Sequence, residues 1–339
     1  MRLICIEFDS KTLRVVAEAG GNVHVAVSKL SGGFERCSGG RLGSPDLKQL
    51  QHVARGERQA NRYWNSLPPQ PLGISSARTH SSPELSALVR IMTYNVHACR
   101  GRDRQWSPQR IADVIASAEP DIVALQELDV GRARSGGADQ AEMIALALGM
   151  RAQFFPALRV MEELYGDAIL TAWPSRLIKA GPLPQLRGVG RYEPRGALWA
   201  SITVGGADVQ VINTHLGLRS RERHKQIDEL LGPDWLGHPD CRNPVVLVGD
   251  FNAPPRSRSY LRLTARLHDA QRSQRGRGKP TFPARFPALR IDYAFVGPAI
   301  NVRRVDTVRT PLARVASDHL PLVIDLDIDA AALPLQPAQ

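Results

Sequence analysis

Residues 246–255 read VLVGDFNAPP, an apolar run that passes through one glycine into an acid, an aromatic residue, an amide and two prolines. The apolar run predicts a strand that lies in the core, and Pro254 and Pro255 cannot continue its hydrogen-bonding ladder. Side chains at positions i and i+2 of a strand lie on the same face. The pattern therefore presents Asp250 and Asn252 side by side at the end of a strand. They are either ordinary solvent-exposed polar residues or part of a functional site.

Strand and helix signals alternate on both sides of this stretch. Strands are predicted over 90–96, 121–127, 167–172, 196–204, 207–216, 244–251, 290–296, 300–308 and 321–328. Helices are predicted from Ser107 onward and over 139–149, 220–232 and 259–267. Gly205 and Gly206 indicate a hairpin turn between two of the strands. Because hairpins interrupt the alternation of strands and helices, the sheets are expected to be mixed.

The composition divides the 339-residue chain, which is long enough for one large domain or two ordinary ones. Residues 1–88 are rich in Gly, Ser and Pro, and we expect a poorly structured N-terminal extension there. An alternative is that translation starts near Val89. Residues 89–328 are expected to form the main domain, and residues 329–339 a C-terminal tail.

The formal net charge of +11 favours an anionic partner. The four cysteines are scattered without a CxxC pair, which is typical of reduced thiols in a cytosolic protein. No apolar run approaches the roughly 20 residues of a membrane span, and Glu7 and Asp9 come too early for a secretory signal. We expect a cytoplasmic monomer without a transmembrane segment, either free or peripheral at a membrane surface.

Acids, amides and imidazoles recur where the predicted strands run into loops. They are Asn95, Glu127, Asn213, His215, Asp250, Asn252, Asp292, Asp318 and His319, with His97 two residues beyond Asn95. Each of them alone has a simpler explanation, such as a turn cap. If the sheets bring the strand ends together, however, the acids repel one another unless a cation lies among them. The oxygen-rich set favours Mg²⁺, with Mn²⁺ as an alternative, and suits attack of water on a phosphate ester.

The motifs TYNVH, LQE, GDAIL, NTHL, GDFN, RIDY and SDH occur in this order over residues 89–328. Together they resemble the endonuclease/exonuclease/phosphatase superfamily, whose members include DNase I-like nucleases and phosphatases. The resemblance implies an α/β (α+β) fold, a four-layer αββα sandwich of two packed mixed sheets. It also implies a Mg²⁺-dependent hydrolase of phosphodiesters or phosphomonoesters, with the metal in a cleft at one edge of the sheets.

The resemblance also implies roles for single residues. The predicted metal ligands are Asn95, Glu127 and Asp318. The predicted catalytic residues are His215, Asp250, Asn252, Asp292 and His319: Asp250 and Asn252 position or activate water, and the two histidines contact the phosphate, with Asp292 orienting His319. His97 and Arg195 are weaker candidates for the substrate phosphate. Asp167 stands where relatives often carry Asn, and it receives no role.

The substrate class stays open at this point. Residues 256–290 contain ten Arg or Lys residues against one acid, Asp269. This charge suits nucleic acid, an anionic lipid headgroup or a merely solvated loop, and sparse aromatics argue against a platform for stacking single strands. The alternatives are a phosphoesterase acting on phospholipids or small phosphoesters, a Mg²⁺-dependent DNA endonuclease or exonuclease, and a non-catalytic anion-binding module of the same fold.

Overall fold

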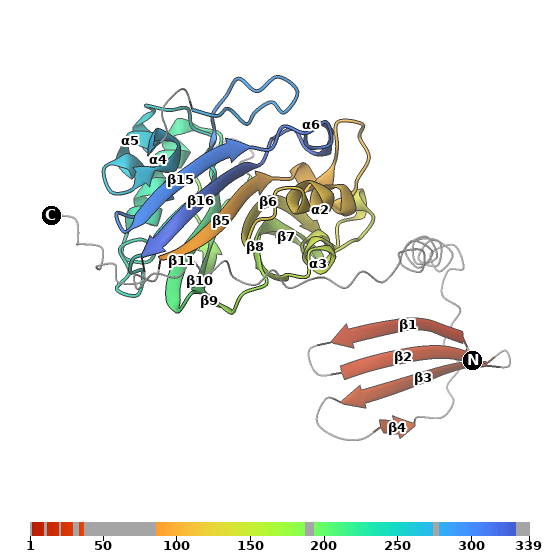
Figure 1. The fold of residues 1–339 in the computed structure, drawn as a ribbon. Helices are drawn as coiled ribbons and strands as arrows, with labels where there is room; N and C mark the ends of the chain where they lie inside the picture. Colours follow the sequence, from red (N-terminus) through yellow and green to blue (C-terminus); the bar gives the residue numbers. More distant parts are fainter. Residues whose placement is uncertain are drawn as a thin grey trace. The chain divides into compact units, whose positions relative to one another are not determined.

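The computed structural model describes residues 2–9, 12–19, 22–29, 34–36, 86–186, 193–273 and 278–329. The chain divides into two compact units, residues 1–75 and 76–339. In the first unit, β1 (Arg2–Asp9), β2 (Thr12–Ala19), β3 (Asn22–Lys29) and β4 (Phe34–Arg36) form an antiparallel sheet in that order (Figure 1). Residues 37–85 of the predicted extension and 330–339 of the predicted tail lie outside the described residues, and the alternative start near Val89 stays a prediction.

The second unit contains two six-stranded sheets. The β5 sheet has the order β15 (Ile300–Thr307), β16 (Leu322–Asp329), β5 (Ser86–Asn95), β6 (Ile122–Val130), β8 (Glu163–Thr171) and β7 (Arg151–Val160). The β12 sheet has the order β13 (His268–Asp269), β14 (Asp292–Val296), β12 (Val245–Asp250), β11 (Ala207–His215), β10 (Gly196–Val204) and β9 (Ser175–Pro182). Parallel pairs β5–β6 and β11–β12 stand among antiparallel ones, so both sheets are mixed as predicted.

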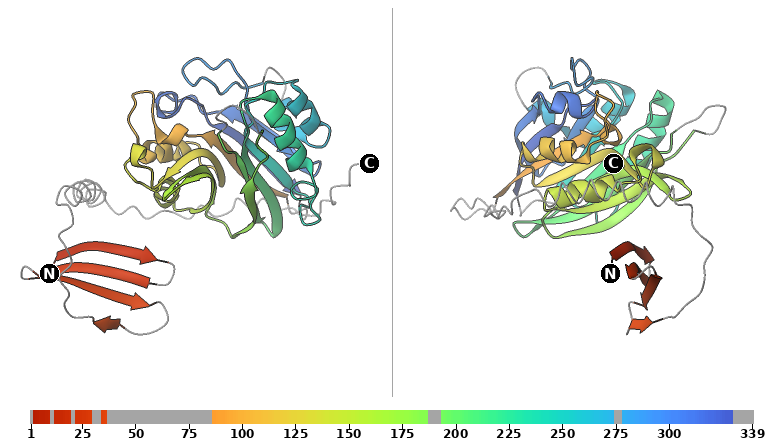
Figure 2. Two further views of the ribbon diagram at one scale, coloured as in Figure 1. Left: turned by 180° about the vertical axis from the view of Figure 1, so that it is seen from behind. Right: turned by 90° about the vertical axis from the view of Figure 1, so that its right-hand side faces the viewer.

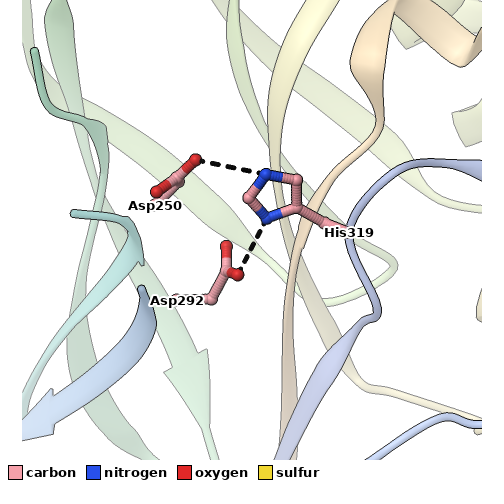
Figure 3. Close-up of side chains that lie close together, drawn as sticks. All are labelled: Asp250, Asp292 and His319. Atoms are coloured by element: carbon pink, nitrogen blue, oxygen red, sulfur yellow. Dashed lines mark hydrogen bonds and ion pairs between the residues drawn. The ribbon is translucent and has the colours of Figure 1, made fainter. Parts of the chain in front are cut away.

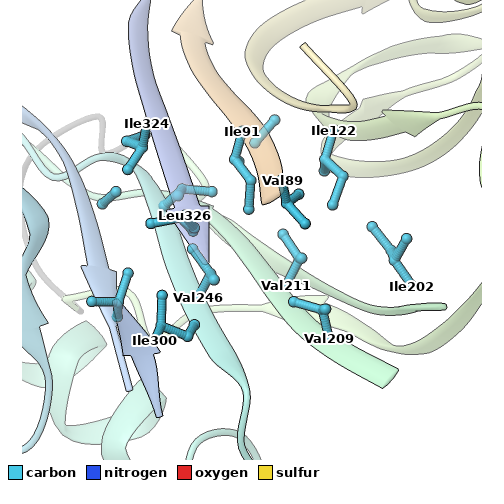
Figure 4. Close-up of a cluster of buried hydrophobic side chains, with 14 of the residues drawn as sticks. Val89, Ile91, Ile122, Ile202, Val209, Val211, Val246, Ile300, Ile324 and Leu326 are labelled. Atoms are coloured by element: carbon cyan, nitrogen blue, oxygen red, sulfur yellow. The ribbon is translucent and has the colours of Figure 1, made fainter. Parts of the chain in front are cut away.

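Three apolar clusters separate four layers. Side chains that alternate along the strands fill the space between the sheets, among them Ile91, Val211 and Val246 (Figure 4). Helices α2 (Pro108–Ala116) and α3 (Gln140–Ala147) pack on the outer face of the β5 sheet. Helices α4 (Ser220–Leu231) and α5 (Arg258–Thr264) pack on the outer face of the β12 sheet (Figure 2). The predicted αββα sandwich is confirmed.

A local signal in the sequence explains where helix α2 begins. Helix α2 begins after Ser107, whose Oγ accepts a hydrogen bond from the backbone N of Arg110 at 3.2 Å, with Pro108 in the first turn. The remaining short helices are η1 (His97–Cys99), η2 (Ala133–Ser135), η3 (Ala270–Ser273) and α6 (Ala313–Ala316). Among the described residues, no helix has the length and apolar character needed to cross a membrane.

Within the two six-stranded sheets, the sequence prediction missed β7, β9 and the two-residue strand β13. Each lies at an edge of its sheet, and most residues of β7 and β9 are exposed or only partly buried. Because an edge strand covers little of the core, it needs no continuous apolar run and leaves a weak pattern. Pro156 within β7 weakens the strand signal further.

Asn213 joins the two sheets by hydrogen bonds. Its fully buried side chain donates from Nδ2 to the carbonyl oxygens of Leu125 at 2.8 Å and Ala168 at 2.9 Å. Its Oδ1 accepts from Gln126 Nε2 at 2.7 Å. This strand-end amide therefore fastens β11 to β6 and β8.

We expect Asn213→Ala to lower the free energy of unfolding by about 3 kcal/mol, because the carbonyls of Leu125 and Ala168 would lose a buried donor and Gln126 Nε2 would lose its shortest acceptor. Urea unfolding measures the loss. Asn301→Ala is the matched control, since Asn301 is exposed on β15, and it should change stability by less than about 0.5 kcal/mol. An Asn213→Ala variant as stable as this control would contradict the role of the amide.

Candidate active site

The strand registers bring the predicted residues His215, Asp250 and Asp292 together at one end of three neighbouring strands of the β12 sheet. Strand β12 lies between β11 and β14. Asp250 pairs in register with His215 on the parallel side and with Asp292 on the antiparallel side. On the β5 sheet, Asn95 ends β5 and is in register with Gln126, the neighbour of Glu127.

Asp250 lies at the centre of this group and is 1% exposed. Its Oδ2 accepts a hydrogen bond from Asn95 Nδ2 at 3.1 Å, and it lies 3.5 Å from His215 Nε2 and 3.7 Å from His319 Nε2. Burial and the charge of Asp292 raise the pKa of Asp250 to about 7, although His319 opposes the shift. A carboxylate that changes protonation near neutral pH suits proton transfer.

Asn252 reaches Asp250 by a turn, which differs from the predicted strand geometry. Strand β12 ends at Asp250, and Asn252 has a left-handed φ of 47°. Its backbone N donates to Asp250 Oδ1 at 2.9 Å. Its side-chain amide lies 3.1 Å from His215 Nε2 and donates to the Leu216 carbonyl at 2.9 Å. The acid and the amide thus share His215 as a neighbour.

His319 and Asp292 form a buried pair (Figure 3). His319 Nδ1 lies 2.9 Å from Asp292 Oδ2, and the same oxygen accepts a hydrogen bond from Thr281 Oγ1. Burial lowers the pKa of His319, but the charges of Asp292 and Asp250 outweigh burial and raise this pKa to about 10. At neutral pH the imidazole is therefore cationic, and its Nε2–H faces Asp250.

His215 is held in the opposite protonation state. Arg195 Nη1 donates to His215 Nδ1 at 2.9 Å, which favours the tautomer with the ring proton on Nε2, although Asn252 Nδ2 lies 3.1 Å from that nitrogen. Burial and the charges of Arg195 and His319 lower the pKa of His215 well below its usual value. Arg195 is 5% exposed and also pairs with Glu193 at 3.0 Å. It thus lies against His215 rather than at the surface, and its contact with a substrate phosphate stays a prediction.

Asn95 contacts both Glu127 and Ser317, the neighbour of Asp318 in the SDH motif. Asn95 Nδ2 donates to Glu127 Oε1 at 2.9 Å, and Ser317 Oγ donates to the Asn95 carbonyl at 2.8 Å. Glu127 does not end its strand as predicted, because β6 continues to Val130. Instead, an irregularity in the β6–β8 register and a left-handed φ of 63° set the position of Glu127.

His97 does not share a strand face with Asn95. Strand β5 ends at Asn95, and His97 opens the short helix η1 with a left-handed φ of 48°. Its half-exposed side chain pairs with Asp318, with 3.8 Å between Nδ1 and Oδ1. The structure therefore places His97 at the border of the group, next to the late acid of the SDH motif.

Three residues without a predicted role support this group. Asp167 is buried near Glu127 and Arg195, and burial raises its pKa to about 8 against the charge of Arg195. Thr281 bonds to Asp292, and Ser317 bonds to Asn95 and accepts from the backbone N of His319 at 3.3 Å. Ser317 lies inside the SDH motif and could have been noticed, whereas nothing around Thr281 indicates its role.

The donor set fits a hard divalent cation. Ligand atoms of Asp250, Asp292 and His319 lie within 4.8 Å of one another, but the cationic His319 has no free nitrogen for a metal, so the available donors of this group are the carboxylate oxygens of the two acids. Asp292 Oδ1 is buried and has no hydrogen-bond partner among the described residues. Such an uncompensated carboxylate oxygen is what a bound cation would satisfy. This compact group differs from the predicted ligands Asn95, Glu127 and Asp318, which lie beside it and are also oxygen donors.

The molecule has two packed mixed sheets between helical layers, and acids, amides and histidines lie where strands of both sheets end. This combination defines the DNase I-like class of phosphoester hydrolases. The chain belongs to the Endonuclease/Exonuclease/phosphatase family, whose model matches residues 92–319. Members of this family hydrolyse phosphoester bonds.

Several individual proteins are similar to this chain in sequence or fold. The protein YbhP of Escherichia coli is 27% identical over 253 residues, which span 70% of this chain and 96% of YbhP. A Beutenbergia cavernae member of the family has a solved structure that is 24% identical, with a TM-score of 0.55 over 71% of this chain and 72% of that one. The mannosyl-6-phosphatase of Bacteroides thetaiotaomicron is 21% identical, with a TM-score of 0.56 over 70% and 99%.

Proposed function

We propose that the protein is a divalent-metal-dependent phosphoesterase that hydrolyses its substrate by attack of water. One observation carries the proposal: the Asp250 carboxylate lies between a neutral histidine, His215, and a cationic one, His319. A proton acceptor with a pKa near neutral, beside a neutral and a cationic imidazole, suits in-line displacement at phosphorus.

Each residue then has a defined task. Asp250, with Asn252, orients the attacking water and accepts its proton. His319, held by Asp292, donates a hydrogen bond from Nε2–H to a phosphate oxygen. His215, on the other side of Asp250, donates a hydrogen bond from its own Nε2–H to the phosphate. Because Arg195 fixes the tautomer of His215, it acts as a positioning residue.

Glu127, Asn95 and Asp318 would hold the cation. When bound, it neutralises charge on the phosphoryl oxygens. The oxygen donors support Mg²⁺, with Mn²⁺ as the alternative.

Cys99 and Cys241 are free and buried, which supports the proposed cytoplasmic location.

The basic stretch gives only limited support to nucleic acid as the substrate. Four of its side chains have polar partners within the chain: Arg262 pairs with Asp228, Arg266 donates to two backbone carbonyls, Lys279 pairs with Asp306, and Arg290 pairs with Asp269. The charge of this stretch is thus partly neutralised. We therefore place phospholipids and small phosphoesters ahead of nucleic acid, and one structural relative carries the name of a sugar phosphatase.

A substrate panel with Mg²⁺, Mn²⁺ or EDTA tests the proposal. The panel holds plasmid DNA, single-stranded DNA, RNA, phospholipids, inositol phosphates and the p-nitrophenyl mono- and diesters of phosphate. We expect turnover with either metal and none in EDTA. Glu127→Gln should reduce turnover at saturating metal by about a hundredfold or more, because it removes a charged oxygen ligand.

Glu119→Gln is the matched control, because Glu119 is exposed and lies before β6 begins at Ile122, whereas Glu127 lies within that strand. Full activity in EDTA, or equal activity of the two variants, would contradict metal dependence at Glu127. Plasmid nicking without lipid cleavage would favour the nuclease alternative. A protein that binds anions but turns over nothing in the panel would be the non-catalytic module.

A further inference from the structure

Exposed apolar side chains concentrate on three short segments, 100–106, 282–290 and 309–316, which we call the rim surface. It carries five of the thirteen large apolar side chains that are exposed among the described residues. They are Trp106, Phe286, Leu289, Leu312 and Val315, and Phe286 is the most open of them at 70% exposure. A concentration of this kind indicates an interaction site rather than scattered surface residues.

Hydrogen bonds join the three segments into one surface. The backbone N of Arg102 donates to the Val315 carbonyl at 2.9 Å. Arg314 Nη1 on α6 donates to the carbonyls of Arg285 at 2.9 Å and Ala284 at 3.4 Å. Figure 1 shows α6 beside the chain that follows β5.

The rim surface borders the candidate active site. The ring of Phe282 lies 4.9 Å from that of His319, between centroids. The backbone N of Ala284 donates to the Asp318 carbonyl at 2.6 Å. A partner that rests on Phe286 and Leu312 would therefore lie next to the SDH segment.

The charge of the rim surface is strongly positive. Its segments contain seven arginines, of which Arg290 is paired with Asp269, and a single acid, Asp103, which Arg110 already pairs at 2.6 Å. Arg100 lies over the ring of Trp106 at 5.1 Å, and Arg285 lies over that of Phe286 at 5.0 Å. Apolar tips beside arginines match a membrane interface, where the tips enter the acyl boundary and the guanidinium groups contact headgroup phosphates.

Nucleic acid fits this surface less well. Phosphate contacts use the arginines, and base stacking uses aromatic rings. Three of the five exposed apolar side chains, Leu289, Leu312 and Val315, are aliphatic and would serve neither purpose.

We propose that the rim surface docks the protein on an anionic phospholipid bilayer, with the active site turned toward the lipid headgroups. The docking is independent of catalysis. Only the corollary that a lipid phosphoester is the substrate rests on the proposed function.

Cosedimentation of the full chain with vesicles, in EDTA, tests the docking. We expect binding to phosphatidylcholine vesicles that contain phosphatidylglycerol, weaker binding to phosphatidylcholine alone, and release by salt. The double variants Phe286→Ser/Leu312→Ser and Arg102→Glu/Arg285→Glu should each weaken binding by at least about tenfold. The matched controls, Leu88→Ser/Leu146→Ser and Arg151→Glu/Arg176→Glu, replace exposed residues on β5, α3, β7 and β9 and should bind like the wild type.

Three results would overturn the proposal: no binding of the wild type to anionic vesicles, rim variants that bind like the wild type, or controls that lose as much as the rim variants. A DNA duplex and an RNA oligonucleotide form the competing arm. The surface would be assigned to nucleic acid if the wild type bound one of these oligonucleotides but no vesicles, and if Arg102→Glu/Arg285→Glu abolished that binding.

Two further measurements separate docking from catalysis. Glu127→Gln should bind vesicles like the wild type although it turns over poorly. The rim variants should keep the activity of the wild type on a soluble p-nitrophenyl ester. If the rim variants lost soluble activity in proportion to vesicle binding, the surface would belong to the active site and the docking proposal would fail.

Discussion

The Asp250→Asn variant is expected to fold normally and to lose turnover by about a thousandfold. Asparagine keeps the shape of the side chain and can still contact Asn95 and His215, but it cannot accept a proton from water. The charge at this position is unfavourable for folding, since burial beside Asp292 raises the pKa of Asp250 to about 7. The unfavourable contribution appears as the pH rises from the unfolded pKa toward 7. In EDTA at pH 8, the variant should therefore be at least as stable as the wild type.

Steady-state turnover of the best substrate in the panel, with thermal unfolding in EDTA, measures both effects. Asp234→Asn is the matched control, because Asp234 has a 68% exposed side chain and pairs only loosely with Lys179 at 3.5 Å. This control should keep full activity. If Asp250→Asn retained more than about a tenth of the wild-type rate, Asp250 could not be the proton acceptor.

The Gly249→Ala variant is expected to be destabilised by more than about 3 kcal/mol, or not to fold at all. Gly249 has a left-handed φ of 143°, and a Cβ at this position would lie 1.8 Å from the backbone oxygen of Thr214. Neither a rotamer change nor a small shift can relieve a clash with the backbone of a paired strand. Urea unfolding measures the loss.

The Gly206→Ala variant separates the effect of the left-handed backbone conformation from the effect of the steric clash. Gly206 has a left-handed φ of 90° in the turn between β10 and β11, but nothing lies within 4 Å of the position that a Cβ would take there. This control should lose only about 1 kcal/mol, the backbone contribution alone. Equal losses at the two glycines would show that the approach of β12 to β11 does not require the glycine.

The sequence predicted the buried strands far better than the exposed ones. The apolar runs at 90–96 and 244–251 overlap β5 and β12, which lie inside their sheets, whereas the edge strands β7 and β9 were missed. The end of β5 at Asn95 shows a second limit. A left-handed turn follows it, so the predicted shared face of Asn95 and His97 does not form.

The candidate site was foreseen as a set of residue types, but not as an arrangement. Asp250, His215 and Asp292 were noticed because each stands at a strand end in a motif. Their proximity follows from register between strands that are far apart in the chain. Thr281 and Asp167 received no role, since neither the hydroxyl bonded to Asp292 nor the burial of Asp167 leaves a local pattern.

By itself, the sequence determined which segments are apolar enough to form the core and which polar residues follow them, because these properties depend on neighbours along the chain. Only the tertiary structure decided that His215 is neutral while His319 is cationic. The pKa of each imidazole depends on burial and on charges from other strands: Arg195 beside His215, and Asp292 and Asp250 beside His319. Electrostatic effects of this kind act through space, so the order of residues along the chain does not reveal them.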